Sequence, residues 1–312
     1  MATSTTTTCE GTTVDPPAAP GVRPLVRKSL AEETLVIGWS EVSDTSQSVT
    51  VRWPQRHAFY VEDGRYSPML FTESLRQALA LLTHRAHHVP LDHRLGWEHI
   101  RASVDPAALP ATSDAAIVTL LVTHSSVKVR RLGSVHLTSR IEALRSGMPV
   151  GTAELQYTTH PPRVYDRLRG PYADARQSFA RALPLTPPVP APRVGRSHER
   201  DVVLSPTGSP HQWQLRVDVG HRVLFDHPHD HVPGMVLLEA ATQAAQAVTA
   251  HPVVTVEFDT TFFRFVEFDQ PCLVTAEPGA PDGEGRARVK VSASQLGRTV
   301  FSSTLTTVPR HS

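Results

Sequence analysis

The sequence reads PMLFTESLRQALA at residues 68–80 and GMVLLEAATQAAQ at residues 234–246, a constant offset of 166. Both segments are rich in Ala and Leu, and their apolar residues lie nearly all round a helix, which is typical of a buried helix. The coinciding positions are Met69 and Met235, Glu73 and Glu239, Gln77 and Gln243, and Ala78 and Ala244. Self-similarity at a fixed offset indicates a duplicated architecture.

The repeat continues beyond the two helical segments. Pro106 matches Pro271 at an offset of 165, and Gly147, Val150 and Leu155 recur at an offset of 150 as Gly297, Val300 and Leu305. The decreasing offset predicts a shorter inter-strand loop in the second copy.

Runs of β-branched and aromatic residues flank each helical segment and predict strands. In the first copy they cover residues 35–39, 49–53, 93–104, 115–123 and 150–159, and in the second copy 212–219, 253–268 and 286–294. One buried helix wrapped by a curved antiparallel sheet is the hotdog arrangement. The sequence therefore predicts an α+β fold, a tandem double hotdog whose two central helices are each wrapped by an antiparallel sheet and packed as a pseudo-dimer, with clefts between the repeats.

Prolines cluster at positions 184, 187, 188, 190 and 192. Their fixed φ and missing N–H disfavour both helix and central strand. We therefore predict an extended, Pro-rich connector at 161–198. It separates a first hotdog domain at 24–160, which follows a disordered leader at 1–23, from a second hotdog domain at 199–308.

The composition excludes several classes of protein. The 312 residues are 40% hydrophobic and 20% charged, as in a folded soluble protein, and the net charge of +1 provides no field for nucleic acid or an anionic membrane. No apolar run approaches the ~18 residues of a membrane span, and the leader lacks signal-peptide features, so we expect a cytoplasmic protein. Cys9 and Cys272 are the two cysteines, which disfavours a disulfide framework, and we expect Cys272 to be a core residue.

The stretch FDHPHDHVPGMVLLEAATQAA at residues 225–245 combines a histidine-rich loop, a Pro-Gly step and a helix. Gly234 at the helix start lets a carbonyl group approach the free N–H groups and positive end of the helix dipole. The amides of Gly234 and Met235 are therefore a candidate oxyanion site.

Glu239 and Gln243 project from nearly the same face of the second helix, one turn apart, and Glu73 and Gln77 repeat this spacing. A buried carboxylate is costly unless it is paired or used in chemistry. Glu239, Glu73, His231 and Gly234 are our candidate catalytic residues. The alternative is that both glutamates only hold their helices to the loops.

Histidines 227, 229 and 231 alternate, which on an extended segment would place three imidazoles on one side, as in some metal sites. Pro228 and the absence of Cys, Glu-x-x-His or HExxH context argue against a metal, and we expect neither a metal nor a cofactor. His57, ahead of the first helix, is either a counterpart of this loop or a solvated turn residue.

Two arginines are candidate anion clamps. Arg76 lies three residues after Glu73 and could either pair with it on the helix surface or bind an anion. Arg264 and Glu267 would lie on opposite faces of a strand, and an inward Arg264 would need an anionic partner such as a phosphate or Glu239. With Gln77, Gln243 and Met235 they complete our candidate substrate-binding set.

At these residues the chain resembles the A-factor biosynthesis (AfsA) family of actinomycete γ-butyrolactone synthases, which consist of two hotdog repeats. The resemblance covers about residues 24–307 and is carried by SPMLFTESLRQA at 67–78, PPRVYDRLRG at 161–170, DHVPGMVLLEA at 230–240 and FFRFVEFDQPC at 262–272.

The resemblance implies an acyltransferase. A β-ketoacyl group would pass from an acyl carrier protein thioester to the hydroxyl of dihydroxyacetone phosphate, on the way to a γ-butyrolactone-type or related regulator of antibiotic production. We leave a homodimer open.

Two residues bear on the alternatives. Aligned with the hotdog dehydratase motif, Phe225 stands where the dehydrating histidine would be, which disfavours a dehydratase or thioesterase. Thr242 stands where the family usually has Arg, so that Glu239 lacks the nearby arginine that Glu73 has. An inactive ligand-binding or regulatory protein is the main alternative. The difference between the two helices also indicates one composite active site, or one degraded one, in place of two equal active sites.

Overall fold

A computed structural model describes residues 21–310. Residues 1–20 of the predicted leader, with Cys9, lie outside the described residues. Strands of the first half are β1 (Val36–Ser43), β2 (Ser46–Trp53), β3 (Val61–Glu62), β4 (Arg65–Tyr66), β5 (Arg94–Val104), β6 (Ala116–Val129), β7 (Val135–Arg145) and β8 (Met148–His160). Strands of the second half are β9 (Leu204–Pro206), β10 (Gln212–Leu215), β11 (Val253–Phe262), β12 (Cys272–Pro278), β13 (Ala287–Gln295) and β14 (Arg298–Pro309).

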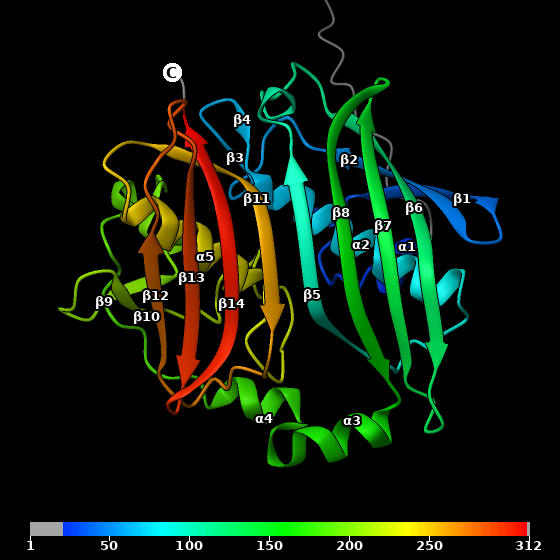
Figure 1. Ribbon diagram of the computed structural model, residues 1–312. Helices are drawn as coiled ribbons and strands as arrows, with labels where there is room; N and C mark the ends of the chain where they lie inside the picture. Colours follow the sequence, from blue (N-terminus) through cyan, green and yellow to red (C-terminus); the bar gives the residue numbers. More distant parts are fainter. Residues whose placement is uncertain (1–20, 311–312) are drawn as a thin grey trace, which may run out of the picture.

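Twelve of these strands form one antiparallel sheet that spans both halves (Figure 1), in the order β1-β2-β6-β7-β8-β5-β11-β14-β13-β12-β10-β9. The halves meet where β5 pairs with β11, with Ser103 opposite Glu257 and His99 opposite Thr261. The seam therefore consists of backbone hydrogen bonds, and the two repeats share a single continuous sheet.

Two central helices, α2 (Pro68–Arg85) and α5 (Gly234–Ala247), pack on one face of this sheet, one behind each half (Figure 1). Most of their residues are buried, which explains why neither has a clear polar face. The predicted α+β class, with one central helix against the sheet of each repeat, is confirmed. A small β3–β4 hairpin precedes α2.

The hairpins that end each repeat confirm the equivalence read from the sequence. The β7–β8 turn has Ser146 at φ 50° and Gly147 at φ 78°, and the β13–β14 turn has Leu296 at φ 52° and Gly297 at φ 71°. Two consecutive residues with positive φ are typical of a tight hairpin turn, for which glycine is suited. The smaller offset has two origins. The loop before β12 is shorter than the loop before β6, and β12 is shorter than β6 itself.

Three expectations about local structure were incomplete or wrong. The predicted strand at 212–219 ends at Leu215, and the one at 253–268 ends at Phe262. The set of long strands was also incomplete, because neither β7 nor β14 was predicted. Cys272, by contrast, is buried at the start of β12 as expected, and burial raises the pKa of its thiol to about 12.

The connector is helical in its first half, which corrects the extended segment that we predicted. It contains α3 (Pro162–Arg169) and α4 (Ala175–Ala180), with Pro162 in the first turn of α3, where proline is compatible with a helix. These helices cross beneath the lower ends of the strands in Figure 1. The remaining short helices are α1 (Val22–Leu25) and the 3-10 turns η1 (Pro106–Ala108), η2 (Gly170–Tyr172), η3 (Ala191–Val194) and η4 (Glu199–Asp201).

Candidate active site

Glu73 on α2 lies in a buried ionic cluster. Arg76 donates hydrogen bonds to both carboxylate oxygens, at 2.8 and 2.7 Å, Gln77 donates a third at 2.8 Å, and Lys28 Nζ lies 3.1 Å away. Burial alone would raise the pKa of Glu73, but the charges of Arg76 and Lys28 outweigh it and lower the pKa to about 2. Glu73 is therefore a stable anion and a weak base.

Gln77 ties this cluster to the segment that enters β1. Its amide donates to the carbonyl of Glu33 at 2.7 Å, and its carbonyl accepts from the N–H of Leu35 at 2.8 Å. Since Gln77 also bonds Glu73, the glutamate and the glutamine together hold α2 to the start of the sheet. This geometry fits the anchoring role that was our alternative for the paired residues.

The second half repeats the same bonds. Gln243 donates to Glu239 at 2.7 Å and to the carbonyl of Asp201 at 2.8 Å, and it accepts from the N–H of Val203 at 2.9 Å. Arg196, which follows η3 in the connector, reaches the two oxygens of Glu239 at 2.9 and 2.7 Å. Our expectation that Glu239 lacks a nearby arginine is wrong, because Arg196 fills that role. Helical spacing could not reveal it, since Arg196 lies 43 residues away in the sequence.

A histidine and an acid close each of these networks. His57 lies 3.2 Å from Glu33, and His221 lies 3.0 Å from Asp201. Each Nδ1 accepts hydrogen bonds from the N–H groups two and three residues onward. The counterpart of His57 is thus His221, and both of our interpretations of His57, as a counterpart of the 227–231 loop or as a solvated turn residue, are corrected.

A cavity of about 350 Å³ lies between the repeats, where the start of α5 faces the middle of α2. Its walls include the 227–233 loop and the first residues of α5, Arg76 and Leu79 of α2, and Trp97 of β5. The end of β11 and the segment that follows it, Phe262 to Val266, complete the lining. Apolar side chains thus share this cavity with arginines and histidines, as in many ligand sites. Glu73 and Glu239 are not among its lining residues.

His231 lines the cavity and is paired with an acid. Its Nδ1 lies 3.0 Å from Asp230 Oδ1, and Asp230 Oδ2 accepts a 2.7 Å hydrogen bond from the hydroxyl of Tyr165. Burial opposes ionisation of Asp230, but its bond to His231 and the nearby positive charges lower the pKa of Asp230 below its ordinary value. A carboxylate that holds the Nδ1 proton leaves Nε2 of His231 able to accept another.

Arg169 fixes Asp230 in place. Its Nε donates to Asp230 Oδ2 at 2.7 Å and its Nη2 to the Asp230 carbonyl at 2.8 Å, while Nη1 and Nη2 reach the two oxygens of Glu267 at 2.7 Å each. Arg169 and Tyr165 lie one turn apart on α3, in the PPRVYDRLRG stretch. Sequence reasoning assigned them no role, although their spacing of four on an amphipathic helix was the available signal.

Gly234 begins α5 in a place with little room. A Cβ added there would lie 3.1 Å from the Trp97 ring and 3.2 Å from the Phe262 ring. The first ladder bond of α5 runs from Val236 N–H to the Pro233 carbonyl. The preceding N–H groups, those of Gly234 and Met235, belong to the unsatisfied start of the helix and can serve an anion.

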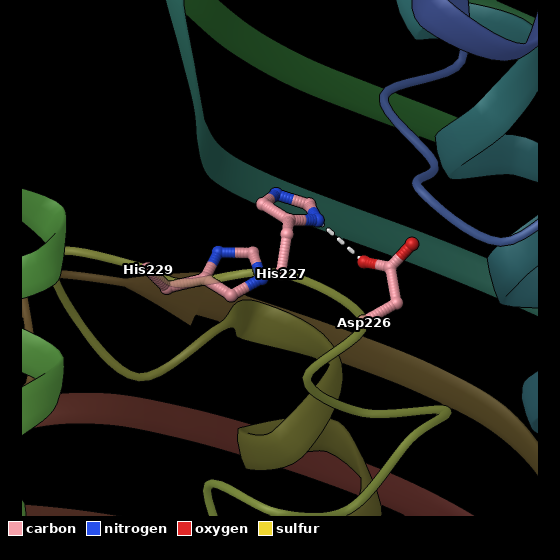
Figure 2. A group of neighbouring side chains, drawn as sticks. All are labelled: Asp226, His227 and His229. Carbon is pink, nitrogen blue, oxygen red and sulfur yellow. Dashed lines mark hydrogen bonds and ion pairs between the residues drawn. The ribbon is translucent and has the colours of Figure 1, made fainter.

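The other two histidines of the loop belong to a separate cluster (Figure 2). Asp226 accepts a hydrogen bond from His227 Nδ1 at 2.5 Å, and the rings of His227 and His229 lie 4.2 Å apart. Burial and the neighbouring His227 and His231 lower the pKa of His229 to about 3, so this imidazole is neutral. Asp226, His227 and His229 have potential metal-ligating atoms within 4.8 Å of one another, and they could hold a metal ion. Lys28 lies near enough to Asp226 to lower its pKa, so a cation there would be repelled.

Arg264 lines the cavity, which is the position that an anion clamp would need. It lies after the end of β11, so the strand alternation with Glu267 that we predicted does not apply. Glu267 instead pairs with Arg169, and the Arg264 side chain has no hydrogen bond or ion pair within residues 21–310.

Phe225, which stands where a dehydratase would have its histidine, is buried against the rings of Phe179 and Phe268 and is a core residue.

Two segments of the chain, residues 11–161 and 177–310, match the family model of the A-factor biosynthesis hotdog domain. The chain belongs to this family. One curated relative is the 2-oxo-3-(phosphooxy)propyl 3-oxoalkanoate synthase of Streptomyces virginiae, 36% identical over 283 residues, which cover 90% of this chain and 95% of the relative. A synthase of the same name from Streptomyces coelicolor is 35% identical over 307 residues, which cover 95% and 94%.

A solved structure shares the fold of this family member. The crystal structure of an oleoyl thioesterase from Lactobacillus plantarum aligns with a TM-score of 0.54 at 12% identity, covering 87% of this chain and 99% of that chain. The predicted double hotdog is thereby confirmed. Among the described residues, no helix is both long and apolar enough to cross a membrane.

This family member has a second pocket at the equivalent place in the other repeat. It lies at the start of α2, next to Ser67 and Pro68, and it is lined by Glu239, Thr242 and Arg196 of the second half. Its volume is about 90 Å³, much smaller than the cavity at α5. The two pockets are therefore unequal, in line with the asymmetry between Arg76 and Thr242.

Proposed function

We propose that this protein transfers a 3-oxoacyl group from a thioester to a hydroxyl of dihydroxyacetone phosphate. The curated relatives are named for an ester of these two parts, and the family match covers both halves of the chain. An acyl carrier protein is the donor that we propose, and a γ-butyrolactone-type or related regulator is the product that follows when the ester cyclises.

The observation that carries this proposal is the Asp230–His231 pair in the cavity at the start of α5. Transfer to a hydroxyl requires a base for the hydroxyl proton and donors for the thioester oxyanion. His231 Nε2 is the base in our proposal, and the N–H groups of Gly234 and Met235 are the donors. Asp230, Tyr165 and Arg169 orient the base.

The proposed reaction has two steps. His231 takes the hydroxyl proton as the acceptor oxygen bonds to the thioester carbon, and the carbonyl oxygen becomes an anion at the start of α5. When this intermediate collapses, the carbon–sulfur bond breaks and the departing thiolate takes the proton that His231 holds. The apolar part of the cavity, with Trp97, Phe262 and Leu237, would hold the acyl chain.

We assign Glu73, Glu239, Gln77 and Gln243 to anchoring instead of catalysis. Neither carboxylate lines the cavity, and both are already bound to cations and to a glutamine. The inactive binding protein is now a weaker alternative, because it rested on Glu239 lacking an arginine and Arg196 fills that role.

The test is an acyl transfer assay on the full chain. A 3-oxoacyl thioester and dihydroxyacetone phosphate are incubated with the protein, and the phosphorylated ester is measured by mass spectrometry. His231→Gln should lower kcat by roughly 10²–10⁴-fold, as expected for loss of a general base. The matched control is His251→Gln on the exposed turn after α5, which should retain wild-type turnover.

Two outcomes would contradict the proposal. If the wild type forms no ester above a no-enzyme blank, the acyltransferase assignment is wrong. If ester forms equally well with His231→Gln, the activity stands but another group is the base, and Glu73→Gln and Glu239→Gln become the next variants to assay.

A further inference from the structure

Three arginines line the 350 Å³ cavity between the repeats. Arg76 comes from α2, Arg27 from the segment after α1, and Arg94 from the first position of β5, and all three line the cavity. Burial and the positive charges of Arg94 and Arg76 lower the pKa of Arg27 to about 10, so Arg27 lies close enough to both to be repelled by them. This repulsion makes the partly buried Arg27 unfavourable unless negative charge balances it, whereas solvent screens the exposed Arg94.

The carboxylates nearby balance the charge of Arg76, whose pKa Glu73 and Asp226 help to raise against the effect of burial, but they do not balance Arg27 and Arg94. Glu73 faces both Arg76 and Lys28, so one anion serves two cations. Glu98, Asp226 and Asp230 are paired with His136, His227 and His231, respectively. The carboxylate that acts on Arg27 in the stabilising direction is that of Asp92, which is exposed.

Each arginine keeps donors available for a ligand. Arg27 Nη2 donates to the carbonyls of Leu91 and His93 and lies 3.3 Å from His84 Nε2, whereas its Nη1 has no partner in residues 21–310. The Arg94 side chain makes no hydrogen bond or ion pair with any described residue. Arg76 binds Glu73 through Nε and Nη2, which leaves Nη1 outside that pair.

We infer that Arg27, Arg76 and Arg94 bind a phosphate group, and that it is the phosphate of the acyl acceptor. Three guanidinium groups that line one cavity suit a dianion with three acceptor oxygens better than a carboxylate. This inference rests on the proposed function, and it replaces the Arg264 clamp with a different set.

A second source of the same chemistry is the phosphate of a phosphopantetheine arm on the donor. The two sources can be distinguished by which substrate, the acceptor or the donor, depends on the arginines for its affinity. An acceptor subsite makes the enzyme prefer dihydroxyacetone phosphate over free dihydroxyacetone, whatever the donor. A donor subsite makes it prefer carrier-bound thioesters over short N-acetylcysteamine thioesters, which have no phosphate.

The experiment uses Arg94→Gln and Arg27→Gln in the full chain, with an N-acetylcysteamine thioester as donor. We expect the KM for dihydroxyacetone phosphate to rise roughly tenfold or more in each, because each loses a charge-assisted contact. Turnover of free dihydroxyacetone should not change. Arg140→Gln, on an exposed side chain of β7, is the control and should match the wild type.

Binding is measured separately by titrating dihydroxyacetone phosphate into each protein in a calorimeter. Weaker binding by Arg94→Gln and Arg27→Gln supports the subsite even if no ester forms, so the subsite and the proposed function can fail independently. Unchanged KM and affinity in both variants would overturn the inference. So would a loss that occurs with carrier-bound donors alone, because it would assign the arginines to the donor arm.

Discussion

The two central helices carry the same anchoring bonds but serve pockets of very different size. In the first half, Glu73 is bound by Lys28 from the loop and by Arg76 from the helix itself. In the second half, Glu239 is bound by Arg196 from the loop, and Thr242 stands at the helix position of Arg76. Arg76 faces the 350 Å³ cavity, whereas Arg196 closes on the 90 Å³ pocket. The comparison indicates that the glutamate anchors the central helix in both halves, whereas an arginine on the helix itself accompanies the larger cavity, which can hold a ligand.

The largest expected effect separates the two glutamates. Glu73→Gln leaves Arg76 and Lys28 buried without their anion, which should cost about 3–5 kcal/mol of unfolding free energy. Glu239→Gln leaves Arg196, which keeps the Phe59 carbonyl at 2.8 Å and Glu62 at 3.7 Å, so the cost should be smaller, about 2 kcal/mol. Urea unfolding measures both. An equal or larger loss in Glu239→Gln would contradict the comparison.

The pH dependence should reveal the same cluster. The pKa of Glu73 is lowered from 4.5 to about 2 in the folded state. Its ionised form therefore stabilises the fold above about pH 4.5, and this contribution, about 3 kcal/mol, disappears as the pH falls toward 2. Urea unfolding of the wild type and Glu73→Gln at pH 6 and pH 3 should show the difference between them shrinking at the lower pH. A constant difference would mean that Glu73 is not held ionised by its neighbours.

The smallest effect is a coupling between Thr242 and Arg196. Thr242→Arg alone adds a second guanidinium to the small pocket, and Arg196→Lys alone weakens the contacts to Glu239 and to the Phe59 ring, 4.1 Å away. The double variant copies the Lys28–Arg76 arrangement, so its loss of unfolding free energy should be about 1 kcal/mol less than the sum of the single losses. Additive losses in this double-mutant cycle would show that the two halves are not interchangeable at this position.

The fold was largely predictable because duplication leaves a signal that periodicity alone does not. The constant offset placed both helices, and Gly147 and Gly297 marked equivalent hairpins before any strand was assigned. The connector was harder, because the prolines that predicted an extended segment lie at 184–192, whereas α3 and α4 come before them and Pro162 occupies the first turn of α3, where no N–H is needed.

The site was only partly predictable because its parts come from distant segments. Gly234, His231, Arg76 and Arg264 line one cavity, as the sequence suggested, and Glu239 faces the other pocket. The start of α5 and Arg76 of α2 line one cavity because of how the two repeats pack against each other, and the local spacing of residues does not encode this packing. Arg196, Arg169 and Arg27 were missed for the same reason, since each acts on residues far away in the chain.

The hydrogen-bonded seam between β5 and β11 has a consequence for how such a site can change. In a dimer of identical subunits every substitution is made twice, so an arginine cannot be gained in one site and omitted from the other. With both repeats in one polypeptide, each half accepts its own substitutions while the shared sheet keeps the halves in register. The second repeat can then supply the proposed base and oxyanion donors, while the first accumulates positive charge that two symmetric copies would both have to carry.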